Sequence, residues 1–226
     1  MSKLDDGMGW FKGTFGTAVT QAVAGTAFDI DLMTALATQE TFEIWGNVFT
    51  SVATAKILEI CVGDTIDAPG RSAFPTSKKA LLTDPNGARL FDVARAALEE
   101  MGRYNATYHR IAEANPDKFC HGFGIFQYDI QFAQLGHDPD FFLQRRWLSF
   151  TECLNKALNE LRTAQRSAGL AAKATLTPLE QAYVAIAYNT GSFKPEKGLK
   201  QGYRDGTGKY YGELIFGYIN RARAIP

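Results

Sequence analysis

Apolar residues recur every three or four positions along most of this chain, a spacing that is typical of amphipathic α-helices. The clearest example runs from Phe141 to Ala168 and predicts one long helix that stops at Gly169. We expect six residues to form the buried side of that helix: Leu143, Trp147, Phe150, Leu154, Leu158 and Leu161.

The same spacing predicts six further helices, over residues 18–28, 32–43, 51–62, 90–101, 178–191 and 210–222. Asp29 and Asp31 are suited to cap the start of the second of these helices. Thr177-Pro178 followed by Glu180 marks the start of the fifth, because proline is favoured in the first helical turn.

Two segments break the helical pattern. Gly63–Pro75 is punctuated by glycine and proline, so we interpret it as a loop, and Gly122–Gln131 has room for a short extended piece. We find no internal repeat and no linker long enough to divide the chain. The pattern therefore predicts a mainly α fold in a single domain.

Length and composition agree with a folded protein. The chain has 226 residues, of which 46% are hydrophobic and 21% are charged, so it can bury a full core and is neither disordered nor collagen-like. No apolar run reaches the roughly 18 residues that span a bilayer. The N-terminus opens with Asp5 and Asp6 instead of a basic segment, so it gives no clear signal peptide.

Three cysteines, Cys61, Cys120 and Cys153, are too few for a disulfide framework. At most one bridge can form, which leaves one thiol free. We expect no essential disulfide, because a core of this size is stable without one.

The charges balance overall but not along the chain. Lysine plus arginine equals aspartate plus glutamate, 24 of each, and a nucleic-acid-binding protein needs a basic excess, so we expect no nucleic-acid partner. Residues 194–226 nevertheless contain seven Lys or Arg against three Asp or Glu. Two interpretations stay open for this basic end: ordinary solvated charge, and a site for an anionic partner.

Glu40 is the first candidate for a catalytic residue. The histidines lack metal-site spacing, and the chain has neither a complete dinucleotide-binding glycine loop nor a GxSxG elbow. Glu40 is followed by Phe42, Ile44 and Trp45, which can desolvate it and raise its pKa. A carboxylic acid that keeps its proton near neutral pH can protonate a glycosidic oxygen. The alternative is an ordinary surface glutamate at a helix end.

Two later segments place polar groups among aromatic residues. His121-Gly-Phe-Gly124-Ile-Phe-Gln127-Tyr-Asp129 has two glycines that let the backbone approach a ligand closely. Ala185-Ile-Ala-Tyr188-Asn189-Thr-Gly191 is a helix that ends in a Tyr-Asn pair. Taken alone, each is as typical of core packing or capping as of an active site.

Together and in this order, the three segments resemble the lysozyme superfamily, most closely the goose-type lysozymes and the lytic transglycosylases. Leu36-Ala-Thr-Gln-Glu40-Thr resembles the catalytic-glutamate helix, Gly124-Ile-Phe-Gln127-Tyr-Asp129 the Gly-Leu-Met-Gln segment, and Ala187-Tyr188-Asn189-Thr-Gly191 the Ala-Tyr-Asn-x-Gly helix end. Tyr210-Tyr211-Gly212 falls where many members have a tyrosine-glycine element. The likeness in layout covers residues 29–220, and close identity is confined to these motifs.

The sequence departs from the family pattern at two places. Thr41 stands where the family has serine, and a long stretch separates the glutamate helix from the glycine segment. The resemblance therefore implies a lysozyme-like catalytic domain over residues 29–226, with an insertion at about residues 46–120 and an N-terminal extension over residues 1–28.

The resemblance also implies roles for single residues. Glu40 is expected to be the general acid, and Asp129 is the first choice for a second catalytic carboxylate. Asp64 and Asp67, in the Gly/Pro loop, come next, with turn formation as their alternative.

The expected sugar site is lined by Gly124, Gln127, Tyr188 and Asn189, with the Tyr188 hydroxyl orienting Glu40. Tyr210 and Tyr211 are expected to stack on sugar faces or to serve as core aromatic residues.

The implied activity is hydrolysis of the glycan strands of bacterial peptidoglycan, without a metal or organic cofactor. A lytic transglycosylase stays open, because there the sugar's own hydroxyl attacks and no second carboxylate is needed. A chitinase or chitosanase and an inactive wall-binding module stay open too. We expect a monomer that acts at the bacterial cell wall, in the periplasm or outside the cell, on peptidoglycan or a related amino-sugar polymer.

Overall fold

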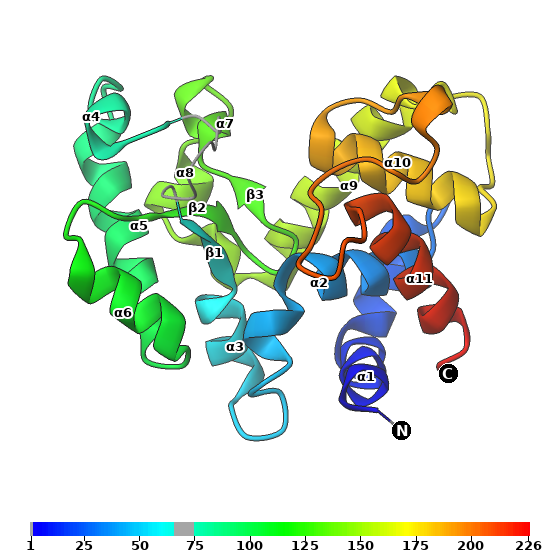
Figure 1. The fold of residues 1–226 in the computed structure, drawn as a ribbon, viewed down its shortest axis with the longest axis horizontal. Helices are drawn as coiled ribbons and strands as arrows, with labels where there is room; N and C mark the ends of the chain where they lie inside the picture. The colour runs from blue at the N-terminus through cyan, green and yellow to red at the C-terminus, as the bar shows by residue number, and fades with distance from the viewer. Residues whose placement is uncertain (1, 66–74) are drawn as a thin grey trace. The chain divides into compact units, whose positions relative to one another are not determined.

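The computed structural model describes residues 2–65 and 75–226. Within these ranges the fold is mainly α-helical, as the periodicity predicts, with eleven α-helices and three short strands (Figure 1). The chain forms two compact units, Met1–Phe42 with Leu154–Pro226, and Glu43–Cys153. The boundaries fall inside α2 (Ile30–Trp45) and α9 (Phe150–Ser167).

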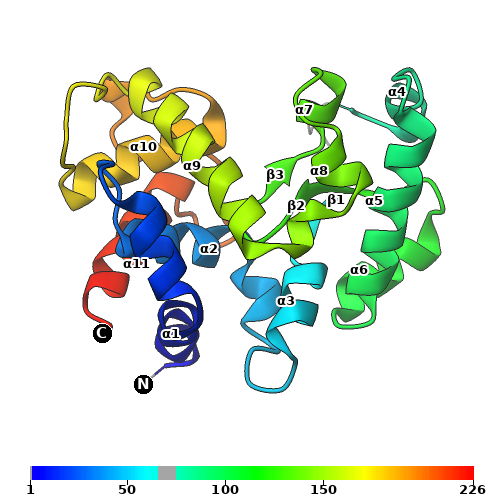
Figure 2. The same ribbon diagram turned by 180° about the vertical axis from the view of Figure 1, so that it is seen from behind.

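The named elements of the first unit are helices. Besides its parts of α2 and α9, they are α1 (Lys3–Val23), α10 (Pro178–Thr190), the 3-10 turn η2 (Pro195–Lys197) and α11 (Tyr211–Arg223). α10 and α11 lie side by side, and α1 contacts α11, as the view from behind in Figure 2 also shows. Buried apolar side chains from these helices form the core of the unit: Phe11, Leu32, Met33, Leu36, Ile186, Ile215 and Ile219.

The N-terminal helix differs in extent from the predicted helix over residues 18–28. It begins at Lys3, where the Ser2 hydroxyl accepts a hydrogen bond from the Asp5 amide and the Asp5 carboxylate accepts one from the Ser2 amide. It ends at Val23, shortly before Gly25, whose φ of 74° is left-handed. This reciprocal cap explains why the helix starts so near the end of the chain.

Asp29 caps α2, the helix that carries Glu40, as the sequence predicts. Its Oδ1 accepts the amide hydrogen of Leu32 at 2.9 Å. Its Oδ2 accepts a hydrogen bond from the Gln181 side chain of α10 at 2.8 Å. One carboxylate therefore starts α2 and also joins it to α10.

Asp31 is not a cap; it lies in the first turn of α2 and pairs with Lys12 of α1 at 2.8 Å. Lys12 Nζ also donates to the Ala222 carbonyl at 2.7 Å, near the end of α11. This shielded lysine supplies positive charge to the C-terminal end of α11, where a cation is stabilising. The start of α2 is thereby fixed to α1 and α11 as well.

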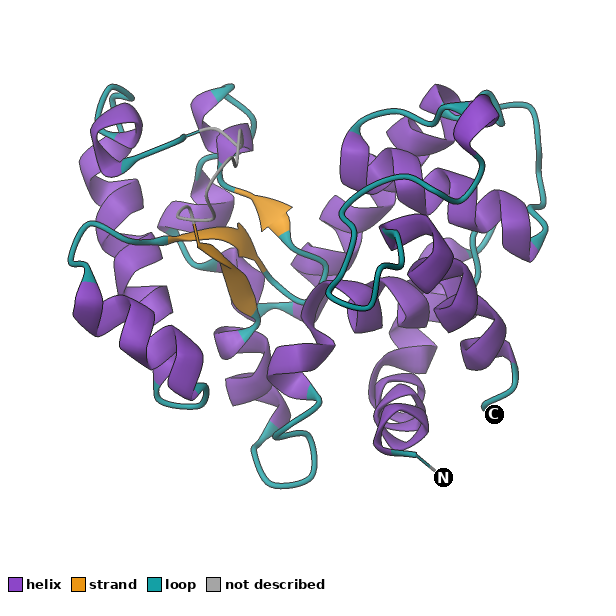
Figure 3. Ribbon diagram, viewed as in Figure 1, coloured by secondary structure: helices purple, strands orange, loops and turns teal. Residues whose placement is uncertain are grey.

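The second unit combines a small sheet with helices that cover it. Its strands are β1 (Val62–Thr65), β2 (Cys120–Phe123) and β3 (Tyr128–Asp129), in the antiparallel order β1-β2-β3 (Figure 3). Val62 lies opposite Phe123, and Gly122 lies opposite Asp129. The other elements are α3 (Thr54–Ile60), α4 (Lys78–Leu81), α5 (Gly87–Gly102), α6 (Ala106–Ala114), α7 (Gln131–Gln134), α8 (Asp140–Leu143) and the 3-10 turn η1 (Arg146–Leu148).

The long helix predicted from Phe141 to Ala168 is wrong in its first part, where the chain forms α8, η1 and only then α9. Arg145 breaks the helix with a left-handed φ of 54°. The break turns Trp147 into the core, where its ring lies 4.9 Å from that of Phe123. Of the six positions predicted to be buried, Leu143 alone is partly exposed.

Two other elements differ from the prediction. Residues 63–65 belong to β1 and not to a loop, while residues 66–74 of that predicted loop lie outside the described residues. α6 was not predicted; Asn105 starts it by accepting hydrogen bonds from the amides of Thr107 and Tyr108. The extended piece predicted within Gly122–Gln131 is confirmed by the ends of β2 and by β3.

No described helix combines the length and the apolar character needed to cross a membrane.

Candidate functional site

Glu40 lies on α2 in the first unit, directly after a run of buried residues that ends at Thr38. Glu40 as a whole residue is partly exposed, while its carboxyl group is buried. Thr41, which stands where the family has serine, is buried, and its hydroxyl donates to the Ala37 carbonyl at 3.1 Å. The buried threonine hydroxyl thus has a hydrogen-bond partner on its own helix.

Tyr211 is the residue that holds Glu40. Its hydroxyl donates a hydrogen bond to Glu40 Oε1 at 2.8 Å, although the two residues are 171 positions apart in the chain. Tyr211 is the first residue of α11, and its side chain is 4% exposed. The bond therefore fixes the carboxyl group of α2 against α11, within one compact unit.

Burial raises the pKa of Glu40 to about 7, and the hydrogen bond from Tyr211 acts in the opposite direction. Loss of hydration therefore outweighs the hydrogen bond at this carboxyl group. The pKa of Tyr211 lies well above its usual value because of burial and the nearby Glu40. Tyr211 consequently keeps its proton and stays a donor, while Glu40 can exchange a proton near neutral pH.

Close packing of the backbone sets the position of Tyr211. The next residue, Gly212, donates its amide hydrogen to the Gln201 carbonyl at 3.1 Å. A Cβ atom at Gly212 would lie 2.4 Å from the Leu199 carbonyl oxygen and 2.6 Å from Ile186 Cδ1. Only glycine lets the start of α11 approach α10 and the 199–201 loop this closely.

Tyr188 and Asn189 lie in the last turn of α10, in the same unit as Glu40. Tyr188 is partly exposed and interacts electrostatically with Tyr211. Asn189 is exposed, and its Oδ1 lies 3.2 Å from the point that a Cβ at Gly202 would occupy. Of the residues expected to surround Glu40, the structure brings Tyr188 and Tyr211 into one cluster with it.

The resemblance gives Tyr188 the task of orienting Glu40, whereas the structure shows a hydrogen bond to Glu40 from Tyr211. The Tyr211 ring is buried, so it takes the core position that was the alternative to sugar stacking. Tyr210 caps the start of α11 through its amide, which donates to Glu213, and its ring is partly exposed. The Tyr-Gly pair at Tyr211 and Gly212 singled out this position in the sequence, but not its hydrogen bond to Glu40.

Gln127 and Gly124 belong to the second unit, where they build the turn between β2 and β3. Gln127 has a left-handed φ of 54°. Its side-chain nitrogen Nε2 donates to the backbone carbonyls of Gly124 and Cys61, at 2.9 and 3.4 Å. A Cβ at Gly122 would lie 2.2 Å from Gln127 Oε1, and one at Gly124 would lie 2.4 Å from Cys153 Sγ. These glycines admit neighbouring side chains of the same unit.

Asp129, the first choice for a second catalytic carboxylate, also lies in the second unit and supports its local structure. Its Oδ1 accepts the amide hydrogen of Gln131 at 2.8 Å. His121 Nδ1 lies 3.4 Å from the same oxygen without making a hydrogen bond, and His121 Nε2 lies 2.9 Å from the Pro75 carbonyl oxygen. The Asp129 carboxylate therefore ends the sheet and starts α7.

The other proposed carboxylates cannot be placed. The backbone of Asp64 belongs to β1, and its side chain, like the whole of Asp67, lies outside the described residues. Among the residues that the structure describes, no three His, Cys, Asp or Glu side chains form a group that could hold a metal ion.

The case for a function depends on the geometry around Glu40 and on the three motifs. No family model matches this chain, and neither a curated protein nor a solved structure is similar to it.

Proposed function

We propose that this chain is a glycosidase that cleaves the glycan strands of bacterial peptidoglycan with Glu40 as its general acid. The observation that carries the proposal is the Glu40–Tyr211 pair: a carboxyl group whose pKa is raised to about 7 by burial and which is held by a buried hydroxyl, on a residue that is partly exposed as a whole. The ordered resemblance to lysozyme-like enzymes supports the choice of substrate. On this proposal the protein acts as a monomer at the bacterial cell wall, and its mechanism needs no cofactor.

The proposed first step is proton transfer from Glu40 to the oxygen that links two sugars. Because Oε1 accepts the hydrogen bond from Tyr211, Oε2 is the oxygen that carries the proton. As the bond between the anomeric carbon and the leaving oxygen breaks, the carboxyl becomes a carboxylate, and the Tyr211 hydroxyl stabilises its charge. In the transglycosylase route a hydroxyl of the sugar then attacks the anomeric carbon and gives its proton to Glu40. In the inverting hydrolase route water attacks, the second carboxylate accepts its proton, and Glu40 regains a proton from solvent.

One observation favours the lytic transglycosylase as a second candidate. The pKa of Glu40 reflects burial and the Tyr211 hydrogen bond, and within the described residues neither cause is a neighbouring carboxylate. Asp129 is engaged at the start of α7. A transglycosylase needs one carboxyl group, because a hydroxyl of the sugar attacks its own anomeric carbon. An inverting hydrolase needs a second carboxylate about 6.5–9.5 Å from the first to activate water.

Mass spectrometry of digested peptidoglycan tests the proposal and separates the two candidates. A hydrolase releases fragments with reducing muramic ends, and a transglycosylase releases anhydro ends. Purified chitin, digested in parallel, tests the chitinase alternative. If peptidoglycan is bound but releases no sugar fragments, the protein is a wall-binding module and the enzymatic proposal is wrong.

A further inference from the structure

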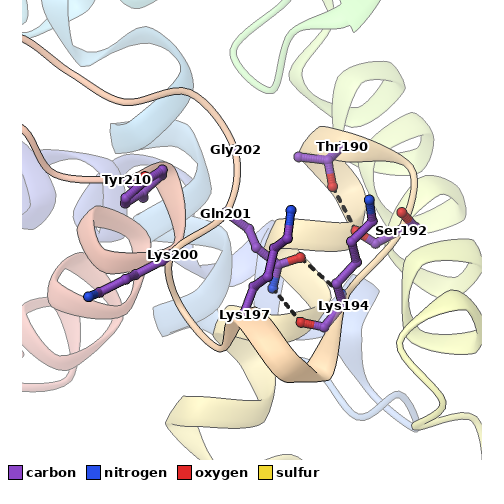
Figure 4. Close-up of a pocket in the computed structure, with 8 residues that line it drawn as sticks. All are labelled: Thr190, Ser192, Lys194, Lys197, Lys200, Gln201, Gly202 and Tyr210. Carbon is purple, nitrogen blue, oxygen red and sulfur yellow. Dashed lines mark hydrogen bonds between the residues drawn. The ribbon is translucent and has the colours of Figure 1, made fainter.

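A pocket of about 260 Å³ opens on the first unit between the end of α10 and the start of α11 (Figure 4). Its lining includes three lysines, Lys194, Lys197 and Lys200, together with Thr190, Gln201 and Tyr210. None of the described residues that line it is acidic. The pocket lies in the basic C-terminal segment, for which the sequence left an anionic partner open.

No described residue forms a salt bridge that would neutralise the charge of this lysine pocket. None of the three ammonium groups forms a salt bridge with a residue in the described part of the chain. Three lysines line this one pocket, and the ammonium groups of Lys194 and Lys197 point to the same side of it. Such a concave positive site attracts anionic ligands.

The loop that presents the lysines is held in place. Gln201 is 7% exposed; its Oε1 accepts the Lys194 amide hydrogen and its Nε2 donates to the Lys194 carbonyl, both at 2.9 Å. The Thr190 hydroxyl donates to the Ser192 carbonyl at 2.7 Å, and Figure 4 shows both sets of bonds. The backbone on each side of the pocket is thus fixed, and less entropy is lost when a ligand binds.

One wall of the pocket packs against Tyr211, the residue that holds Glu40. Gly202, in the pocket wall, lies so close to Tyr211 that an added Cβ would be 2.6 Å from the Cβ of Tyr211. The Tyr211 amide donates to the Tyr203 carbonyl at 2.8 Å. The segment 201–203, part of which forms the pocket wall, therefore also supports Tyr211, the residue that holds Glu40.

We propose that the lysine pocket binds carboxylate groups of the peptides carried by the glycan, so that the enzyme prefers peptide-bearing strands to bare glycan. This inference rests on the proposed function, because it names the form of the substrate that the Glu40 site receives. Neutral chitin offers the pocket no charge to bind.

The directions of the lysines favour separate carboxylates. In Figure 4 the ammonium groups of Lys194 and Lys197 point to the same side, while that of Lys200 points away from them. Charges spread in this way fit negative groups spaced along an extended chain better than one enclosed phosphate. Lysine also binds as a point charge, without the two-pronged geometry with which arginine selects phosphate.

The test compares cleavage of peptidoglycan strands with and without their peptides, the latter prepared with an amidase. The variant Lys194→Gln/Lys197→Gln removes two ammonium groups and leaves the backbone contacts of Gln201 intact. We expect its preference for peptide-bearing strands, as the ratio of kcat/KM values, to fall about tenfold, with most of the change in KM. In the parent, the preference should weaken as salt is added.

The matched control is Lys79→Gln/Lys209→Gln, which removes two exposed lysines that do not line the pocket. It should keep the preference of the parent. A parent that cleaves both substrates without preference, or a lysine-pocket variant that keeps the preference, overturns the inference and leaves the proposed function standing.

A binding measurement separates failure of the pocket from failure of the catalytic proposal. The Glu40→Gln protein is sedimented with intact and with peptide-free cell-wall sacculi, with and without the two pocket substitutions. Loss of peptide-dependent binding in the pocket variant supports the inference even if the parent cleaves nothing. If wall teichoic acid or duplex DNA at equal charge competes as well as the peptide-bearing strands, the pocket collects negative charge without recognising peptides, and the inference is wrong.

Discussion

At the scale of single residues, the protonation of Glu40 depends on two opposing effects. Burial disfavours the carboxylate, and the Tyr211 hydroxyl favours it by donating to Oε1. The pKa of about 7 shows that burial is the larger effect. A glutamate of this kind has a proton to donate at neutral pH and is also a source of instability once it is ionised.

Replacing Glu40 by glutamine should therefore change the pH dependence of stability. The raised pKa means that Glu40 contributes its full stability below about pH 4.5 and loses it as the pH rises through about 7. Glutamine stays neutral and still accepts the hydrogen bond. Relative to the parent, Glu40→Gln should gain roughly 1–3 kcal/mol of unfolding free energy between pH 4.5 and pH 8.

Urea unfolding of both proteins at the two pH values measures this gain. A free-energy difference between parent and variant that is the same at both pH values would show that Glu40 has an ordinary pKa, as expected for the surface glutamate that the sequence left open.

Replacing Tyr211 by phenylalanine removes the hydroxyl and keeps the buried ring. Because the Tyr211 hydrogen bond lowers the pKa of Glu40, its loss should raise that pKa further. The alkaline limb of the activity profile should then move to higher pH, while kcat falls about tenfold because the carboxyl group is less well oriented. Tyr218→Phe, in the same helix, is the control and should change neither property. An unshifted alkaline limb in Tyr211→Phe would exclude the positioning role.

The sequence points to Glu40 itself but not to its partner. The apolar residues after Glu40 predict a desolvated carboxyl group, and local sequence is enough for that inference. The hydrogen bond to Tyr211 joins two helices at opposite ends of the chain, so no local pattern can predict it. The motif predicts that Gln127 and Asp129 belong to the sugar site. The structure shows contacts of both side chains that stabilise the turn around them.

At the scale of elements, the approach of α11 to α10 depends on Gly212. A Cβ there would meet the Leu199 carbonyl oxygen at 2.4 Å, so Gly212→Ala must shift the backbone. We expect a loss of about 2–4 kcal/mol of unfolding free energy. Gly217→Ala is a matched control in the same helix, because a Cβ at Gly217 has open space.

The control should raise the unfolding free energy by about 0.5–1 kcal/mol, since alanine favours the helix more than glycine does. Thermal or urea unfolding of the two variants gives both values. Equal effects of the two substitutions would mean that the close packing of α11 against the 199–201 loop is absent in solution.

Helix positions could be predicted where an apolar face and a cap occur together, as in α10. Thr177, Pro178 and Glu180 mark its start, and the structure shows the reciprocal cap there. The helix over Phe141–Ala168 failed because the core contacts of Trp147 outweigh local periodicity. A signal for the true start of α9 was present: Ser149 stands three residues before Glu152, and its hydroxyl accepts the Glu152 amide hydrogen at 3.4 Å.

The strands were harder to predict than the helices. β1 has four residues and β3 has two, too few to show alternation of polar and apolar positions. The pairing of β1 with β2 joins segments that are far apart in the chain, and the register of Val62 against Phe123 depends on that pairing. Short strands held by tertiary contacts leave little trace in a single sequence.

At the scale of the whole molecule, the three cysteines report on folding. All three are buried and none forms a disulfide within the described residues; burial raises the pKa of Cys153 to about 12 and also raises that of Cys120. A thiol reagent should therefore react slowly with the native protein and rapidly with all three thiols after unfolding. Reducing agent should leave Tm unchanged. Fast labelling of the native protein, or a Tm that falls by several degrees on reduction, would contradict this arrangement.

The charge distribution is also a property of the whole molecule. The net charge is zero, but three lysines of the C-terminal segment line one pocket, whose wall at Gly202 packs against Tyr211. Counting charges predicts the basic end, and only the fold shows that its lysines share a hollow with no acidic side chain in the lining.

The most direct test of the central claim is the rate at which Glu40→Gln releases sugar fragments from peptidoglycan. Glutamine keeps the size and hydrogen-bonding reach of glutamate but has no proton to give. We expect a loss of roughly a hundredfold or more, in a protein whose circular dichroism spectrum and Tm show that it is folded. The activity of the parent should fall as the pH rises through about 7, because only protonated Glu40 is active. A Glu40→Gln protein that releases fragments at the rate of the parent would contradict the account.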